Sequence, residues 1–378
     1  MINALIERSQ YPCLAEYAYL NQASLGLIGG SAMQTMHAFL DTVARHGNLN
    51  LKDEDELALI ATLREEAAVM LNCSNEEVAV MACASELLGQ LPLIMQPPKG
   101  SDILVVSSDF PALTRPWLAY AQKSQCTVRL VTDAPNENLT DTLLEAINSS
   151  TAVIAVSLVQ FATGSQIDVL KIRDACKQNG VRFVLDVTQA AGCMQMDARE
   201  WQADAVVTSG YKWLGGHGGV ALAALSPSLI EEAVPLPGWL GAPDPFDFDA
   251  TSVKYAEGGM RFTQSTLSYV SVAGLTAALK ELQLVSMNDR VSHARALAQK
   301  LEDEALLNGW MPFRRSNDES ASANIVTLVK PSANLNSSVD ALRKNNVVCG
   351  IRNGRLRVSL AAYNDGSDID ALARALPS

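Results

Sequence analysis

Two consecutive stretches decide the fold, namely Phe183-Val184-Leu185-Asp186-Val187-Thr188-Gln189-Ala190 and Ala205-Val206-Val207-Thr208-Ser209-Gly210-Tyr211-Lys212. Each begins with a short run of apolar residues rich in valine, which is typical of a buried strand. An aspartate ends the first run and a lysine follows the second. Ligands bind at the carboxyl ends of the strands of a parallel sheet. The sequence therefore predicts Asp186 and Lys212 at that edge.

Strand-like and helix-like pieces alternate on both sides of these stretches. In the helical stretch 169–179, Leu170, Ile172 and Cys176 are interspersed with charged residues, which fits a half-buried helix. Alternation of this kind predicts an α/β domain with a mostly parallel sheet. The other strand-like runs are Ile103–Val106, Val128–Val131, Val153–Ser157 and Val220–Leu225, and the other helical stretches are Leu113–Ser124 and Leu139–Ile147.

The flanking segments predict three parts in the chain. Residues 1–50 form an N-terminal arm that packs near the small domain and the active site, with one helix near 32–46. Residues 51–268 form the large domain, which includes an irregular loop at 236–259 rich in Pro, Gly and Asp. Residues 269–378 form one long linking helix, about 269–306, and a small α+β domain. That domain is expected to contain strands at 325–329 and 356–360 and helices near 338–344 and 368–375.

Composition excludes several classes of protein. The chain has 378 residues, of which 48% are hydrophobic, and its net charge is 29 − 41 = −12, which fits neither a nucleic-acid nor an anionic membrane partner. No apolar run is long enough for a bilayer, and the first residues lack the pattern of a signal peptide. Seven scattered cysteines without a Cys-x-x-Cys pair predict reduced thiols and a cytoplasmic protein. Four histidines without a His-Glu-x-x-His motif predict no metal site.

The lysine and the aspartate match the needs of pyridoxal phosphate chemistry. A lysine must form the Schiff base with the cofactor aldehyde, and a carboxylate must hold the pyridine nitrogen protonated. Hydroxyls and backbone N–H groups must hold the phosphate. Lys212, Asp186 and the hydroxyls of Ser209 and Tyr211 provide these groups.

This region resembles the signature of the class V aminotransferases, which are fold-type I pyridoxal-phosphate enzymes and include cysteine desulfurases, isopenicillin N epimerase and kynureninase. Their Asp-x-x-Gln-Ala and Ser-x-His-Lys segments correspond to 186–190 and 209–212, with Tyr211 in place of the usual His. The resemblance implies a seven-stranded, mostly parallel sheet between helices, pyridoxal phosphate as cofactor, and a homodimer with a shared active site. It makes Lys212 and Asp186 catalytic, and it brings Gln189 to the ring hydroxyl of the cofactor.

Five further segments follow the order of the same family, and each implies a role for one or two residues. They are Tyr19–Gly26, with Asn21 beside the substrate; Cys83–Glu86, with Ala84 and Ser85 in the phosphate turn; Asp109–Trp117, with Phe110 stacked on the cofactor ring; Arg261–Thr266, with Thr266 reaching the phosphate of the neighbouring subunit; and Leu356–Leu360, with Arg357 paired to the substrate α-carboxylate. Ser209 and Tyr211 complete the phosphate site by the same resemblance.

Simpler roles for single residues stay open at this point. Asp186, Ser85 and Ser209 also suit helix caps, and Phe110 suits a core position. Arg357 also suits a structural ion pair, and Thr266 need not cross to another subunit. Cys349, eight residues before Arg357, follows two valines in a strand-like run and is interpreted as a structural thiol.

The predicted activity is that of a pyridoxal-phosphate enzyme acting on a small amino acid or derivative through a carbanion at the α-carbon, with Lys212 as proton shuttle. Within the family, the aminotransferase or epimerase-like branch is favoured, because the loop that carries a desulfurase's nucleophilic cysteine is missing. The alternative is a C–S lyase or another β-eliminating or desulfurase-like enzyme. A protein that binds the cofactor without turnover, and a nicotinamide oxidoreductase, are more distant hypotheses.

Overall fold

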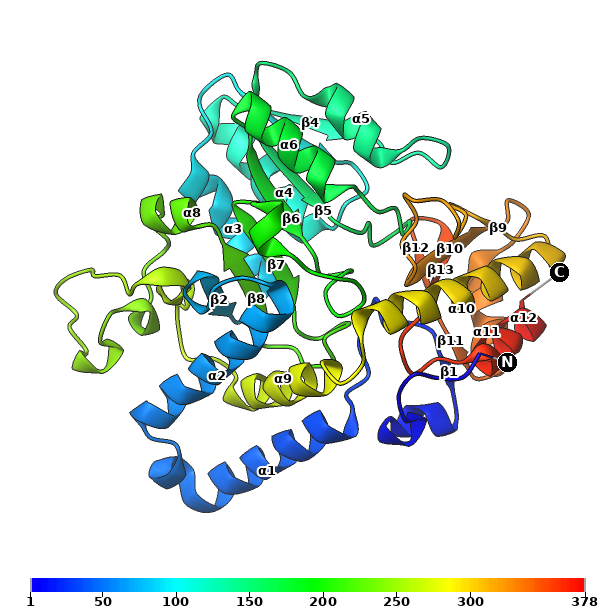
Figure 1. Cartoon of the computed structure of the whole chain (residues 1–378), viewed down its shortest axis with the longest axis horizontal. Helices are drawn as coiled ribbons and strands as arrows, with labels where there is room; N and C mark the ends of the chain where they lie inside the picture. Colours follow the sequence, from blue (N-terminus) through cyan, green and yellow to red (C-terminus); the bar gives the residue numbers. More distant parts are fainter. Residues whose placement is uncertain (1, 377–378) are drawn as a thin grey trace.

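A seven-stranded sheet forms the centre of the large domain in the computed structural model, which describes residues 2–376 (Figure 1). The strands are β2 (Val78–Met81), β3 (Asp102–Val106), β4 (Thr127–Val131), β5 (Thr151–Ser157), β6 (Arg182–Asp186), β7 (Ala205–Ser209) and β8 (Ala221–Leu225). Their order is β2-β8-β7-β6-β5-β3-β4, and only β8 runs against its neighbours within the described residues. The predicted α/β fold with a mostly parallel seven-stranded sheet is confirmed.

Helices cover both faces of this sheet, which explains why its inner strands are mostly apolar rather than alternating, whereas the edge strand β4 is partly exposed. In β3, Leu104 and Val106 join the apolar cluster on one face, and Ile103 and Val105 join the cluster on the other. The first cluster includes residues of α2 (Asp53–Leu71), α5 (Leu139–Ala146), α6 (Val169–Asn179), α7 (Ala198–Trp201) and α9 (Tyr269–Leu282). The second includes residues of α3 (Ala84–Met95), α4 (Pro111–Ser124) and α8 (Pro227–Glu232).

The prediction of one long helix over 269–306 is wrong, because two helices occupy this segment. These are α9 and α10 (Met287–Leu307), separated by the four residues 283–286. The hydroxyl of Ser286 accepts a hydrogen bond from the backbone N–H of Asp289 at 3.1 Å, and this cap begins a new helix. The apolar pattern continues across the break, so periodicity alone could not reveal it.

The small domain contains a four-stranded antiparallel sheet, ordered β12-β13-β10-β9, with helices packed against it. Its strands are β9 (Met311–Pro312), β10 (Ile325–Val329), β12 (Gly350–Arg352) and β13 (Arg355–Ser359), and its helices are α11 (Leu335–Lys344) and α12 (Gly366–Ala375). Trp310, Leu356 and Leu372 belong to its buried apolar cluster, to which α10 also contributes. A small C-terminal α+β domain was predicted, and the extra sheet confirms it.

The N-terminal segment contacts both domains. Strand β1 (Ala18–Tyr19) pairs in parallel with β11 (Val347–Val348) of the small domain, while α1 (Gly30–His46) packs against α9 (Figure 1). Short 3-10 helices complete the described elements, at Arg8–Gln10, Pro12–Ala15, Gly47–Asn50, Asn75–Glu77, Trp239–Gly241, Pro245–Asp247 and Gly258–Phe262. We propose the domain boundaries 1–50, 51–268 and 269–378, in which α9 begins the last segment but packs against the large domain.

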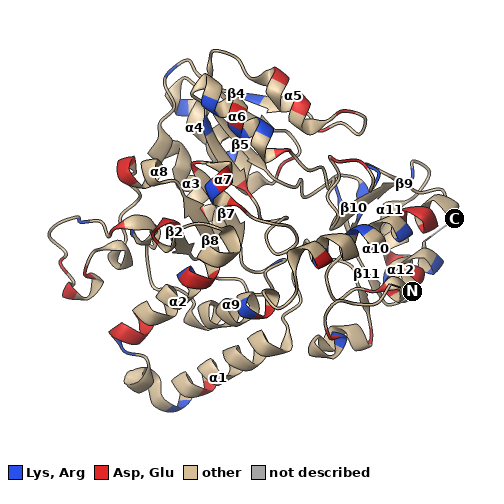
Figure 2. Ribbon diagram, viewed as in Figure 1, with Lys and Arg blue, Asp and Glu red and all other residues tan. Residues whose placement is uncertain are grey.

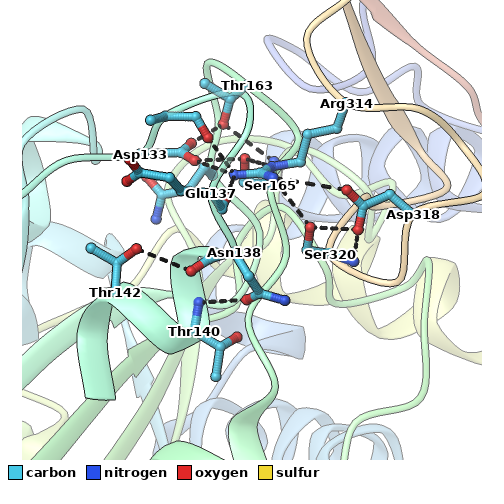
Figure 3. A network of polar contacts seen from close by, with 12 residues as sticks. Asp133, Glu137, Asn138, Thr140, Thr142, Thr163, Ser165, Arg314, Asp318 and Ser320 are labelled. Carbon is cyan, nitrogen blue, oxygen red and sulfur yellow. Dashed lines mark hydrogen bonds and ion pairs between the residues drawn. The ribbon is translucent and has the colours of Figure 1, made fainter. Parts of the chain in front are cut away.

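A buried ion pair joins the two domains (Figure 3). Nη2 of Arg314, in the small domain, lies 2.9 Å from the carboxylate of Asp133, and the two side chains are 3% and 0% exposed. Asp133 also accepts hydrogen bonds from the hydroxyls of Thr163 and Ser165, at 2.6 and 2.9 Å. Further hydrogen bonds surround the pair, and they offset the free-energy cost of removing its two charges from water.

Two of the helices, α6 and α10, carry charged side chains of both signs. Figure 2 shows acidic and basic residues interspersed along α6 and α10, so neither helix presents a face of one sign. Between residues 2 and 376, no helix has both the length and the apolar character that crossing a membrane would require.

Candidate active site

A cavity with an empty volume of about 540 Å³ lies at the carboxyl ends of β5, β6 and β7, beside the start of α3. Ligands of parallel sheets bind at this edge, as the sequence indicated. Eight of the predicted site residues line this one cavity, although they are far apart in the chain. They are Ala84, Ser85, Phe110, Asp186, Gln189, Ser209, Tyr211 and Lys212.

Lys212 and Asp186 are both buried in this cavity. Lys212 is 6% exposed, and burial lowers the pKa of its amine to about 8, against the opposing effect of the Asp186 charge. Burial raises the pKa of Asp186, although its carboxylate accepts a hydrogen bond from the backbone N–H of Thr188 at 2.8 Å. The environment of Lys212 thus brings the pKa of its amine close to physiological pH, so a much larger fraction of the amine is neutral than in an exposed lysine, as a nucleophile or base requires.

The N-terminal segment holds the backbone of the lysine turn. The side-chain amide of Gln22 donates a hydrogen bond to the carbonyl of Lys212 at 2.9 Å, and the N–H of Gly26 donates to the carbonyl of Tyr211 at 2.9 Å. A Cβ atom at position 26 would lie 2.0 Å from the Lys212 carbonyl oxygen. Only glycine permits this approach, so the Tyr19–Gly26 segment positions the turn from a distance of about 190 residues along the chain.

Phe110 presents its ring to the cavity opposite the lysine. Nζ of Lys212 lies 5.2 Å from the centre of the ring, and the ring of Phe161 contacts it edge-on at 5.3 Å. The carboxylate of Asp109 fixes the backbone here, because it accepts from the N–H of Phe110 at 2.6 Å and from the hydroxyl of Ser157 at 2.6 Å. Burial raises the pKa of Asp109 to about 6. Phe110 is 39% exposed, so it is not a core residue.

At one end of the cavity lie several hydrogen-bond donors that have no acceptor among residues 2–376. Helix α3 begins here, and its N-cap residue Cys83 makes no capping hydrogen bond with its side chain. The backbone N–H of Glu86 donates to the carbonyl of Cys83, whereas those of Ala84 and Ser85 have no acceptor among residues 2–376 and stay available. Within residues 2–376, the hydroxyls of Ser85, Ser209 and Tyr211 make no hydrogen bond either. A phosphate group needs this combination of a helix N-terminus and hydroxyl donors, and the residues present therefore fit the phosphate of pyridoxal phosphate.

Gln189 lines the cavity, but both ends of its amide have protein partners. Its Oε1 accepts from the indole N–H of Trp213 at 2.8 Å, and its Nε2 donates to the carbonyl of Ala23 at 3.1 Å. This side chain connects the strand that ends at Asp186 with the lysine turn and with the N-terminal segment. A contact of Gln189 with the cofactor stays a prediction.

Arg357 is 1% exposed, and it is not part of an ion pair within the described residues. Its guanidinium donates to the carbonyl of Phe161 at 2.9 Å and to the hydroxyl of Ser24, while its Nε is buried without a partner. Burial, together with the nearby charge of Arg352, lowers the pKa of Arg357 to about 9. The structural ion pair considered from the sequence is therefore not observed.

Sequence reasoning missed the second guanidinium at this point. Arg352, in β12, donates to the same Ser24 hydroxyl at 2.6 Å, and that hydroxyl donates to Oδ1 of Asn21 at 2.8 Å. Asn21 thus lies beside the two arginines rather than on the cavity wall. No local signal marks Arg352, since it meets Ser24 only through the pairing of β12 with β13 and the placement of the N-terminal segment. Ser157, Phe161 and Thr188 were also missed, although each follows or ends a predicted strand.

Two predicted or weighed residues lie elsewhere. Thr266 is exposed and does not line the cavity, so within one chain it contacts neither Lys212 nor the donors of the α3 end. Cys349 lies between β11 and β12 in the apolar cluster of the small domain, and burial raises the pKa of its thiol to about 12. Such a thiol is protonated near neutral pH and is a poor nucleophile, in agreement with a structural thiol.

Comparison with known proteins agrees with this geometry. The model of the family "Aminotransferase class-V" matches residues 19–372. Cysteine desulfurase CsdA of Escherichia coli (strain K12) is 26% identical over 98% of this chain and 96% of its own. The uncharacterized aminotransferase YcbU of Bacillus subtilis (strain 168) is 22% identical over 94% of this chain and 93% of its own.

A solved structure shares the fold. It is a mutant of C-DES in which glycine is covalently linked to the pyridoxal-phosphate cofactor, and it superimposes with a TM-score of 0.89 at 21% identity, covering 98% of this chain and 99% of its own. The family match spans nearly the whole chain, including the cavity residues from Cys83 to Lys212 and also Arg357. The chain belongs to the class-V aminotransferase family of pyridoxal-phosphate-dependent enzymes.

Proposed function

We propose that the Lys212 cavity holds pyridoxal phosphate and that the enzyme acts there on a small amino acid or derivative, in the aminotransferase or epimerase-like branch of the family. One observation carries the proposal. A buried amine and a buried carboxylate share a cavity whose other end collects free phosphate donors, and a buried guanidinium without an acidic partner lies nearby. The cofactor, when bound, supplies a ring that stabilises negative charge at the substrate α-carbon.

The residues of the cavity then have separate tasks. Lys212 holds the cofactor covalently and moves a proton at the α-carbon, for which an amine with a pKa of about 8 is well matched. Asp186 holds a proton at the ring nitrogen. Phe110 covers the ring face, and Gln189 is directed to the ring hydroxyl. Ala84, Ser85, Ser209 and Tyr211 bind the phosphate.

The substrate carboxylate is assigned to Arg357. A guanidinium and a carboxylate match in a bidentate geometry, and among residues 2–376 no carboxylate forms an ion pair with Arg357 and its buried Nε has no hydrogen-bond partner. Ser24 aligns Arg357 and Arg352 by accepting a hydrogen bond from each, and Asn21 in turn orients the Ser24 hydroxyl. The positive charges of both arginines also lower the pKa of Lys212, so the carboxylate site and the proton shuttle are electrostatically linked.

A spectroscopic screen of amino acids tests the reaction type. Transamination converts the bound cofactor to its amine form and yields one keto acid. Epimerisation yields the other enantiomer of the added amino acid. A C–S lyase or other β-eliminating enzyme instead releases ammonia and a keto acid and leaves the cofactor in its aldehyde form. Ammonia release without the amine form would replace our assignment with this alternative, and no reaction with any amino acid would favour cofactor binding without turnover.

A homodimer with a shared active site is the arrangement that we propose for Thr266. Its exposed position outside the cavity leaves it free to reach the phosphate in a second subunit. Large apolar residues of the neighbouring loop are also exposed, among them Leu236, Phe248 and Val253. Two-fold symmetry is the commonest arrangement of such pairs. We propose the cytoplasm as the location, on the support of seven cysteines that are all unpaired.

Subunit complementation tests the shared site. The variant K212A keeps Thr266 but lacks the lysine, and T266A keeps the lysine. In a mixed dimer, one site combines Lys212 of one subunit with Thr266 of the other. Regained turnover after mixing two weakly active variants supports the proposal. Turnover equal to the sum of the separate variants contradicts it, in a sample that two-step affinity purification of differently tagged variants shows to contain mixed dimers.

A further inference from the structure

A second cavity, with an empty volume of about 770 Å³, lies where the N-terminal segment, α9, α10 and the small domain meet. It shares no lining residue with the Lys212 cavity. Its wall is largely apolar and includes Leu27, Leu282 and Leu360. The proposed reaction uses none of these groups, so the cavity calls for a separate explanation.

One buried cation faces this apolar wall. Arg290, in the first turn of α10, lines the cavity and is 6% exposed. Its Nη1 donates to the carbonyl of Gly192 at 2.9 Å, whereas its Nε is buried and has no partner. Among residues 2–376, no carboxylate forms an ion pair with it. A buried guanidinium without a counter-charge is costly, because its hydration is lost and not replaced.

We propose that this cavity binds a small organic carboxylate, with its carboxylate on Arg290 and its apolar body against Leu27, Leu282 and Leu360. A carboxylate restores the missing counter-charge and can bind Nη2 of Arg290, which makes no hydrogen bond among residues 2–376 and, unlike Nε, is not fully buried. The apolar lining suits a hydrocarbon body rather than a bare inorganic anion. Glu281 also lines the cavity, and its negative charge disfavours a dianion such as a phosphate ester.

The cavity is connected to the catalytic turn through two of its lining residues. Gln22 donates to the carbonyl of Lys212, and its Oε1 accepts from the hydroxyl of Tyr363 at 2.6 Å, which also lines the cavity. Trp213 lines the cavity as well, and its indole N–H donates to Gln189 at 2.8 Å. A ligand in the second cavity therefore touches residues that hold the backbone and the neighbours of Lys212.

Calorimetric titration of the holoenzyme tests the site with three probes. 4-Methylpentanoate has the proposed chemistry, 4-methylpentanamide has the same shape without the charge, and sulfate has charge without an apolar body. We expect the acid to bind about tenfold or more tightly than the amide, because a hydrogen-bonded charge pair is lost in the amide, and sulfate to bind more weakly than the acid. In R290M the preference for the acid over the amide is expected to disappear.

Two control variants place the binding. R295M removes an exposed arginine from the same helix and should leave the titration unchanged. R357M removes the guanidinium that binds carboxylates in the Lys212 site, and the binding that remains in this variant should keep the preference for the acid over the amide, a comparison that stays decisive even if R290M does not fold. Equal affinity for acid and amide, loss of acid binding in R357M alone, or no binding of the acid to the holoenzyme would each overturn the proposal.

Discussion

Nζ of Lys212 lies 5.2 Å from the centre of the Phe110 ring, and the two groups line the same cavity. The amine thus has an aromatic platform on one side and the carboxylate of Asp186 in the same buried space. Because Asp109 ties the backbone of Phe110 to the end of β5, the platform is fixed relative to the strands.

The rate at which the apoprotein takes up pyridoxal phosphate should depend on pH with a midpoint near 8. The uncharged amine condenses with the aldehyde, and the folded protein lowers the pKa of Lys212 from 10.5 to about 8. Stopped-flow absorption should show a rate that rises with pH through 8 and then levels off. In R357M the midpoint should move upward, since the Arg357 charge lowers this pKa. A rate that keeps rising to pH 10 in the wild type contradicts the prediction.

The same group should make the stability of the apoprotein depend on pH. Between about pH 8 and pH 10.5 the unfolded lysine holds a proton that the folded one has lost. The unfolded state therefore binds more protons, and the contribution of Lys212 to the free energy of unfolding rises with pH in that window. In this pH window, the free energy of unfolding obtained from denaturant titrations should rise more steeply with pH in the wild type than in K212M. Parallel curves would argue against the lowered pKa.

R357M should weaken the binding of the amino acid about 10-fold to 100-fold, because one hydrogen-bonded charge pair is removed. The affinity for pyridoxal phosphate should change far less. R355M is the matched control, since Arg355 lies on the same strand but packs over the Phe313 ring at 4.5 Å. Spectral titration of the holoenzyme with the amino acid measures the substrate affinity, and spectral titration of the apoprotein with pyridoxal phosphate measures the cofactor affinity. An unchanged substrate affinity in R357M would remove this residue from the site.

R314M should lower the free energy of unfolding by about 3–5 kcal/mol, because it leaves the buried Asp133 carboxylate without its cation. The double variant D133L/R314M should lose less than the sum of the two single variants. R343M, which breaks an exposed pair with Asp340, should change stability by no more than about 0.5 kcal/mol. Urea unfolding measures all four, and a loss in R314M as small as that in R343M would show that the domains do not depend on this pair.

Cys83, which lines the Lys212 cavity, and Cys349, which is buried in the small domain, should differ sharply in their reactivity toward iodoacetamide. Cys83 is exposed and lines the Lys212 cavity at the phosphate end, so it should be alkylated in the apoprotein and protected by bound cofactor. Cys349 should stay unmodified near neutral pH, because burial raises its pKa to about 12. Mass spectrometry of the labelled peptides resolves the two sites. Rapid, substrate-protected labelling of Cys349 would instead favour a desulfurase mechanism.

The sequence alone predicted the middle of the large domain well, because buried parallel strands leave an unbroken apolar signal. Six of the seven strands of the main sheet follow from such runs. The seventh, β2, has the same apolar character at Val78–Met81 but spans only four residues, and it is not among the predicted strands. The break after α9 was missed for a different reason, since the Ser286 cap is a local contact that interrupts no periodicity.

The candidate site likewise contains residues that local sequence patterns predict and residues that they do not. Asp186, Lys212 and the start of α3 follow strands or open helices, so the fold class places them together. Arg352 and Ser24 are 328 residues apart, and their contact depends on how the N-terminal segment reaches the small domain. Local patterns carry no information on such contacts. The proposed role of Thr266 needs a second subunit, so the structure of a single chain cannot place Thr266 in the site.

Reduction of the purified holoenzyme with borohydride, followed by peptide mapping, tests the central claim most directly. We predict that the near-visible absorption band of the cofactor disappears and that the cofactor becomes covalently attached to Lys212. K212A should give no such adduct, while K280A, which removes an exposed lysine, should behave like the wild type. An adduct that persists in K212A, or one that maps to another lysine in the wild type, would contradict the assignment of this cavity as the active site.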